Sequence, residues 1–131
     1  MIAVKRVYEP AEKSDGYRVL VDRMWPRGLT KQDAALDLWL RDVAPSHELR
    51  KWYNHAPERW PVFCERYYAE LADRTDAVEL LRAKAAEQLL TLLYSSREQA
   101  LNNAEALKSY LSAPPGTVPV IGTGATPATP A

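Results

Sequence analysis

Two short segments of the sequence carry side chains that suit the recognition of an anion. They contain, in chain order, Asp22, Arg23, Trp25 and Arg27, and then Ser95, Ser96 and Arg97. Arginine presents a planar, permanently charged fork of N–H donors that matches a carboxylate or a phosphate. The arginines therefore predict an anionic ligand, and the indole ring of Trp25 could stack on a flat group such as a nucleobase.

Asp22 is the candidate catalytic residue of the first segment. In a buried site its carboxylate could serve as a general base, or it could orient one of the neighbouring guanidinium groups. A purely structural alternative is that Asp22 and Arg23 form ion pairs while Trp25 packs in the core. The sequence leaves these alternatives open.

Other polar residues suggest no cofactor chemistry. Asn102 and Asn103 lie near the start of the last predicted helix, where they could bind a ligand but are favoured as solvated or capping residues. His47 and His55 lack metal-ligand spacing with each other or with Cys64, which is expected to pack within a helix. The chain has no phosphate-binding loop and no dinucleotide glycine fingerprint. We therefore predict neither a cofactor nor a metal.

Strands are predicted directly before both polar segments. Residues 2–8 and 17–21 are rich in β-branched and aromatic side chains. The loop between them is too short for a parallel crossover, so if these strands are neighbours we expect them to pair antiparallel. Residues 89–94 are almost wholly apolar, as in a strand covered on both faces. Residues 36–43 fit a strand or a helix, and we favour a strand that follows a helical turn capped by Thr30.

Helical spacing predicts the remaining elements. Ser46 caps a short helix, and Pro61 must lie in the first turn of a longer one because proline lacks the N–H that interior turns require. Residues 77–86 form the next helix, with Asp76 and Glu79 as its cap pair. The last helix has an apolar face that comprises Leu101, Ala104, Leu107 and Leu111.

This order of elements predicts a small three-layer α/β domain, with a mainly parallel central sheet flanked by helices. Residues 1–112 would form the single domain, and residues 113–131, which carry no charged or aromatic side chain, a flexible tail. Ligands in such folds bind beyond the carboxyl ends of the strands. If strands 17–21 and 89–94 are adjacent and parallel, their polar segments meet in one crevice.

Composition restricts the classes of partner. Lys and Arg number 17, as do Asp and Glu, so the formal net charge is zero; a general nucleic-acid binder carries a basic excess, which argues against nucleic acid. No apolar run approaches the roughly 18 residues of a transmembrane helix, and the N-terminus does not resemble a secretory signal. We expect a cytoplasmic protein without membrane contact, and the sequence leaves a homo-oligomer open.

Three strings resemble the YeaO-like branch of the DUF488 domain family: YRVLVDRMWPRGL, DVAPSHELRKWYNH and TLLYSSRE. The resemblance extends from Val4 to Leu111 and implies a compact bacterial α/β domain. It also implies one site that contains Asp22, Arg23, Trp25, Arg27, Trp52, Arg97 and Asn102. Relatives often carry histidines on both sides of the asparagine, where this sequence has Leu101 and Asn103. A catalytic or metal-binding histidine of such relatives would be missing here.

Two functions of different classes follow. The first is an enzyme, such as a hydrolase in which Asp22 activates water to attack a small anionic, nucleotide-like molecule. The second is a non-catalytic module that binds a ligand or a regulatory partner, which the missing histidines favour. Under both hypotheses the ligand-binding residues are Arg23, Trp25, Arg27, Ser96, Arg97 and Asn102. A DNA-binding regulator is the weakest hypothesis, because the charge is balanced and no helix-turn-helix is evident.

Overall fold

The computed structural model describes residues 1–114 and 116–119, and four parallel strands form its sheet. The strands are β1 (Ile2–Arg6), β2 (Tyr17–Leu20), β3 (Leu38–Trp39) and β4 (Leu90–Tyr94). Their spatial order is β1-β4-β2-β3, and each neighbouring pair is parallel. The predicted α/β class with a parallel central sheet is therefore confirmed. Most of the predicted tail lies outside the described residues.

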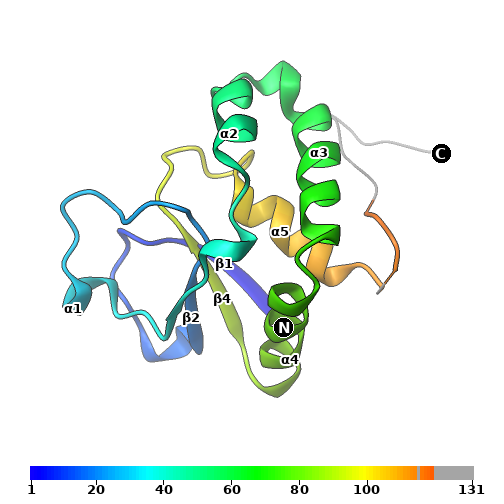
Figure 1. Cartoon of the computed structure of the whole chain (residues 1–131). Coiled ribbons are helices and arrows are strands. Elements are labelled where there is room, and N and C mark those ends of the chain that lie inside the picture. The colour runs from blue at the N-terminus through cyan, green and yellow to red at the C-terminus, as the bar shows by residue number, and fades with distance from the viewer. Residues whose placement is uncertain (115, 120–131) are drawn as a thin grey trace.

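Helices cover one face of this sheet. They are α2 (His47–Tyr53), α3 (Trp60–Ala72), α4 (Thr75–Glu87) and α5 (Asn103–Ser112), whereas the one-turn helix α1 (Lys31–Ala34) stands apart from them (Figure 1). Helices α4 and α5 pack against β4, and α5 also packs against β1. The other face is covered by α1, the loops around it and a 3-10 helix at Lys13–Asp15. Two more 3-10 helices lie at Arg41–Val43 and Pro57–Arg59.

Alternating side chains of the central strands divide the interior into two cores. Val19 and Leu92 belong to the larger core on the helical side, together with side chains of α3, α4 and α5. Leu20 and Leu93 belong to a smaller core on the opposite side, against Trp25 and other apolar residues of the loops. All four aliphatic residues are fully buried. This burial on both faces explains why β4 is almost wholly apolar.

Several predicted helix starts are confirmed by their hydrogen bonds. The Ser46 hydroxyl accepts a hydrogen bond from the N–H of Leu49 at 3.1 Å, and the Thr30 hydroxyl accepts one from Asp33 at 3.0 Å. Pro61 lies in the first turn of α3, as predicted. The favoured strand in residues 36–43 is present as β3, although it has only two residues and a 3-10 helix follows it.

The predicted cap pair of Asp76 and Glu79 is wrong. Helix α4 begins at Thr75, earlier than expected, and its N-cap is Arg74, which makes no side-chain capping bond. The carbonyl of Arg74 accepts the first helical hydrogen bond, from Val78 at 3.0 Å. The tight turn that ends α3 thus sets the start of α4, and Asp76 only adds a negative charge to its first turn.

Strands β1 and β2 are not neighbours, and the antiparallel pairing considered for them does not occur. Strand β4 lies between them, parallel to both. Residues 7–16 connect the two strands without an α-helix. An extended chain advances about 3.3 Å per residue, so these residues can return along a strand of roughly 17 Å and cross two strand spacings of about 4.8 Å. A short loop therefore suffices where we expected a longer crossover.

Gly16 ends this connection in a tight turn before β2. Its φ is 68°, a left-handed conformation that glycine adopts without steric cost. A Cβ atom at this position would lie 2.3 Å from the carbonyl oxygen of Leu89. The turn is therefore pressed against the start of β4, and only glycine fits there.

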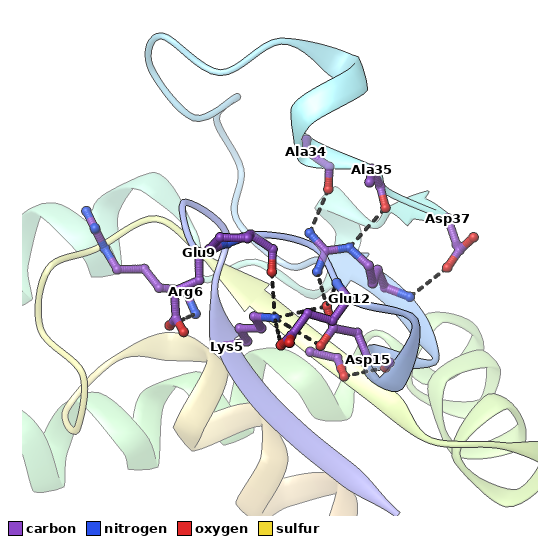
Figure 2. Close-up of polar contacts among 11 residues, drawn as sticks. Lys5, Arg6, Glu9, Glu12, Asp15, Ala34, Ala35 and Asp37 are labelled. Atoms are coloured by element: carbon purple, nitrogen blue, oxygen red, sulfur yellow. Dashed lines mark hydrogen bonds and ion pairs between the residues drawn. The ribbon is translucent and has the colours of Figure 1, made fainter.

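The carboxylate of Asp15 holds the connection against the sheet. It accepts hydrogen bonds from Lys5 of β1 at 3.0 and 3.1 Å and forms an ion pair with Arg18 of β2 at 2.5 Å. Figure 2 shows Lys5 directed toward Asp15 and Glu12. The backbone carbonyl of Asp15 accepts a hydrogen bond from Thr91 of β4 at 2.5 Å. One residue thereby contacts three adjacent strands.

Arg18 and Asp15 are almost completely buried, at 4% and 7% exposure. Burial alone would raise the pKa of Asp15, but the Glu12 N–H, the Lys5 ammonium and the Arg18 guanidinium outweigh it and lower this pKa. Burial would lower the pKa of Lys5, and its bonds to Asp15 and Glu12 outweigh that effect and raise it. The charged forms of both groups therefore stabilise the folded state.

Replacing Asp15 tests this interpretation. Asp15→Asn leaves Lys5 and Arg18 without their shared counterion, and we expect the free energy of unfolding at neutral pH to fall by about 3 kcal/mol in urea denaturation. Because the folded pKa of Asp15 is lowered, its contribution is present above its ordinary pKa and is lost as the pH falls through the folded value. The difference between the two proteins should therefore shrink in acid.

Glu12→Gln is the matched control, because the Glu12 carboxylate is 66% exposed and also contacts Lys5. An exposed ion pair contributes less than about 1 kcal/mol. If both variants lose the same stability, the buried carboxylate has no special role.

Candidate functional site

The polar segments after β2 and β4 meet at one edge of the sheet. The two strands are adjacent and parallel, with Leu20 opposite Leu93. A depression with two lobes opens beyond their carboxyl ends. Lobe A, of about 520 Å³, lies against α2 and the start of α5, and lobe B, of about 830 Å³, lies between the loops that follow β2 and β4. Both lobes share Asp22, Arg50, His55, Ser95 and Ser96.

Asp22 lines both lobes and connects three segments of the chain by hydrogen bonds. Its Oδ2 accepts hydrogen bonds from the backbone N–H of Ser95 at 2.9 Å and from its hydroxyl at 2.7 Å. Its Oδ1 accepts one from the Asn103 amide at 3.0 Å, and its backbone carbonyl accepts one from the Trp39 indole at 2.7 Å. Each carboxylate oxygen is therefore already held by a donor of the protein.

The three predicted arginines line the depression but lie in different lobes. Arg23 is half-buried in lobe A, whereas Arg27 and Arg97 are exposed in lobe B. Within residues 1–114 and 116–119, the Arg23 guanidinium makes one hydrogen bond, a long one of 3.5 Å to the Pro45 carbonyl, and its buried Nε has no partner. In that same part of the chain no carboxylate lies within 4.0 Å of these arginines.

Two further predicted site residues are engaged by the protein itself. Trp25 lines lobe B, but its indole N–H donates to the Leu29 carbonyl at 2.7 Å and its ring packs edge-on against Trp39. Asn102 lines lobe A and caps α5, where its Oδ1 accepts a hydrogen bond from Glu105 at 2.9 Å. Its amide nitrogen donates to the Glu98 carbonyl at 2.9 Å. Both side chains can shape the depression, while their polar atoms are occupied. Ser96 lies at the junction of the lobes.

Sequence reasoning missed the lining residues that lie outside the two polar segments. These are chiefly Arg6, Tyr8, Arg50, Lys51, Asn54 and His55. The Arg6 guanidinium donates to the carbonyls of Ser96 at 2.9 Å and Ser95 at 3.1 Å, so it fixes the loop after β4. The consecutive cations Arg50 and Lys51 were a signal in the sequence for a basic surface, but they line the depression only because α2 lies beside it.

Positive charge dominates the lining. The cations are Arg6, Arg23, Arg27, Arg50, Lys51 and Arg97, and the carboxylates are Asp22 and Glu98. The Glu98 carboxylate accepts hydrogen bonds from the backbone of Ala100 at 2.9 Å and Leu101 at 3.1 Å, which lower its pKa. Both carboxylates are thus satisfied by uncharged donors. The chain has no net charge, yet it concentrates cations at this depression.

Other chemistry receives little support from the structure. No group of three or more His, Cys, Asp or Glu side chains could hold a metal ion within the described ranges. Cys64 is 2% exposed, and burial raises the pKa of its thiol to about 11 despite a hydrogen bond with Tyr68. It therefore packs as a neutral thiol. No helix in the described part of the chain has the length and apolar character needed to cross a membrane.

Fold and site define a small parallel α/β domain with a basic depression beyond its strand ends. A family model described as the inactive DUF488-N3 subclade matches residues 1–117. The chain belongs to this subclade of the DUF488 family, which confirms the resemblance inferred from its strings.

The chain is also similar to individual proteins of this family. "Uncharacterized protein YeaO" of Escherichia coli K12 is 48% identical over 110 residues, which cover 84% of this chain and 96% of that protein. "Uncharacterized protein Rv3073c" of Mycobacterium tuberculosis H37Rv is 43% identical over 111 residues, or 85% and 93% of the two chains. No solved structure matches the chain.

The hydrogen bonds of Asp22 generate a stability prediction. Asp22→Ala leaves the Ser95 N–H without its acceptor and removes one of the two acceptors of the Asn103 amide, which also donates to the Val21 carbonyl. We expect the free energy of unfolding to fall by about 2–3 kcal/mol. Ser95→Ala, which removes only the hydroxyl bond, should cost about 1 kcal/mol. Urea denaturation of the two variants measures both effects. An Asp22→Ala protein as stable as the parent would show that the carboxylate is free for another role.

Proposed function

We propose that this protein is a non-catalytic domain that binds a small anionic ligand, such as a nucleotide-like phosphate ester, in the two-lobed depression. The single observation that carries the proposal is the charge of the lining, where six cations accompany two carboxylates. Cations that lie together repel one another, and a bound phosphate or carboxylate would relieve this repulsion. Arginine forks also suit such a group geometrically.

The volume of the depression and its combination of apolar and basic lining residues support an organic anion as the ligand. Lobe A, at about 520 Å³, falls within the range of roughly 300–1,000 Å³ that is typical of small-molecule sites. Phe63 and Leu101 add apolar surface to lobe A, whereas Arg27 and Arg97 supply positive charge to lobe B. A ligand with an apolar part and an anionic part would use both.

Three observations favour binding over hydrolysis. Both oxygens of Asp22 accept hydrogen bonds from the protein, so the candidate base would have to break a contact to activate water. Leu101 and Asn103 occupy the positions at which the resemblance implies histidines in relatives. The description of the matching subclade as inactive agrees with this reading. The hydrolase hypothesis therefore has the weaker support.

Binding of anions and the role of Arg27 can be tested together. Phosphate, sulfate or nucleoside monophosphates should raise the melting temperature of the protein, because they bind the folded state. Arg27→Ala should weaken this binding about tenfold, as expected for the loss of one charge-assisted hydrogen bond. The stability of the unliganded variant should not fall, since the Arg27 side chain is exposed. Arg27→Lys should restore only part of the effect, because a point charge cannot replace the fork.

Lys31→Ala is the matched control, because Lys31 is exposed and does not line the depression. It removes the same charge from the protein and should leave the anion effect nearly unchanged. The proposal fails if no anion shifts the melting curve. It also fails if Lys31→Ala weakens the anion effect as strongly as Arg27→Ala does.

A further inference from the structure

The turn after α2 places two consecutive residues in the left-handed region of the backbone. Asn54 has a φ of 45° and His55 a φ of 54°. Asn54 ends α2, and its N–H donates to the Arg50 carbonyl at 3.0 Å, a common role for asparagine. His55 then continues in a conformation that glycine would adopt more easily. Such backbone outliers often accompany functional sites, so the His55 side chain is a candidate for a functional role.

His55 lies at the junction of the depression. It is one of the five residues that line both lobes, and three of the others are already engaged. Asp22 and Ser95 bond each other, and the Ser96 hydroxyl accepts a hydrogen bond from the Glu98 N–H at 3.0 Å. The side chains of Arg50 and His55 make no hydrogen bond within the described ranges of the chain. A ligand that spans the two lobes would pass both of them.

The charged groups around His55 come from several elements. His47, Arg50 and Lys51 belong to α2 and Arg6 belongs to β1, whereas Asp22, Arg23 and Arg27 follow β2 and Arg97 and Glu98 follow β4. All of them line a lobe that His55 also lines. The Tyr53 ring lies 6.5 Å from the imidazole, centroid to centroid. Backbone donors of Ala100 and Leu101 lower the pKa of Glu98, and the positive charge of His55 lowers it further. Glu98 therefore stays ionised throughout the range in which histidine gains its charge.

We infer that His55 is an anion-binding residue of this depression and makes its affinity dependent on pH. The inference rests on the proposed function. In acid the imidazolium joins Arg50 at the junction of the lobes and adds one positive charge beside the bound anion. As the pH rises, the imidazole loses its proton and this attraction disappears. An anion should therefore bind more tightly at low pH.

Sulfate is the suitable probe, because it remains a dianion across the range in which histidine titrates, whereas phosphate changes its own charge there. Calorimetric titration of the full chain should show binding about tenfold tighter near pH 6 than near pH 8, the gain of one charge-assisted hydrogen bond. His55→Asn keeps a residue that tolerates the left-handed backbone but cannot become charged. It should bind as the parent does near pH 8 and lose most of the increase near pH 6.

The chain has only one other histidine, His47, which lines lobe A but not lobe B. His47→Asn should keep most of the pH dependence and is the matched control. Two results overturn this inference alone: sulfate binding that does not vary with pH, or an unchanged pH dependence in His55→Asn. The absence of sulfate binding at every pH would instead overturn the proposed function, and this inference with it.

Discussion

The buried carboxylate of Asp15 is the interaction on which the fold depends. A parallel sheet whose first two strands are separated by a third needs a connection that crosses one face, and this one crosses without an α-helix. Asp15 anchors that connection by neutralising one cation from β1 and another from β2. The anchored connection thereby holds β1 and β2 on either side of β4. The shared edge of strand ends, and hence the depression, follows from this arrangement.

The depression is basic because the protein satisfies its local carboxylates in another way. Asp22 and Glu98 take their hydrogen bonds from backbone N–H groups, a hydroxyl and an amide. Their charges therefore organise the loops, while the guanidinium groups of Arg27, Arg50 and Arg97, which also line the depression, make no hydrogen bond within the described residues. The Asp15 carboxylate, in contrast, is neutralised by ion pairs with Lys5 and Arg18. Carboxylates and cations thus stabilise one face of the sheet as ion pairs, whereas at the edge of the sheet the cations line a depression.

Many of the strands and helices could be predicted from the sequence, because they depend on local signals. An apolar strand that ends in a polar segment marks β2 and β4, and hydroxyl caps mark the helices that begin after Thr30 and Ser46. Strand order depends on distant parts of the chain, so the insertion of β4 was not foreseen. The burial of Arg18 was missed because it requires Asp15 and the carbonyls of α1 to converge on it.

For the candidate site, the sequence predicted which strand ends meet but not how each side chain is engaged. The capping bonds of Asn102 and the packing of Trp25 depend on the final geometry of the loops. The contribution of α2 to lobe A was missed, because the string that contains this helix does not show that its cations Arg50 and Lys51 line the depression. Composition also concealed the basic character of the site, since a balanced total can hide an uneven distribution of charge.

The central position of β4 has a consequence for synthesis on the ribosome. Strand β4 begins at Leu90, about 70 residues after the end of β2, and it lies between β1 and β2 in the sheet. A nascent chain that lacks it leaves an edge of β1 and an edge of β2 without their partner, and unpaired edges of this kind favour aggregation. The sheet can form only after residues 90–94 have been translated, well after both strands that they join.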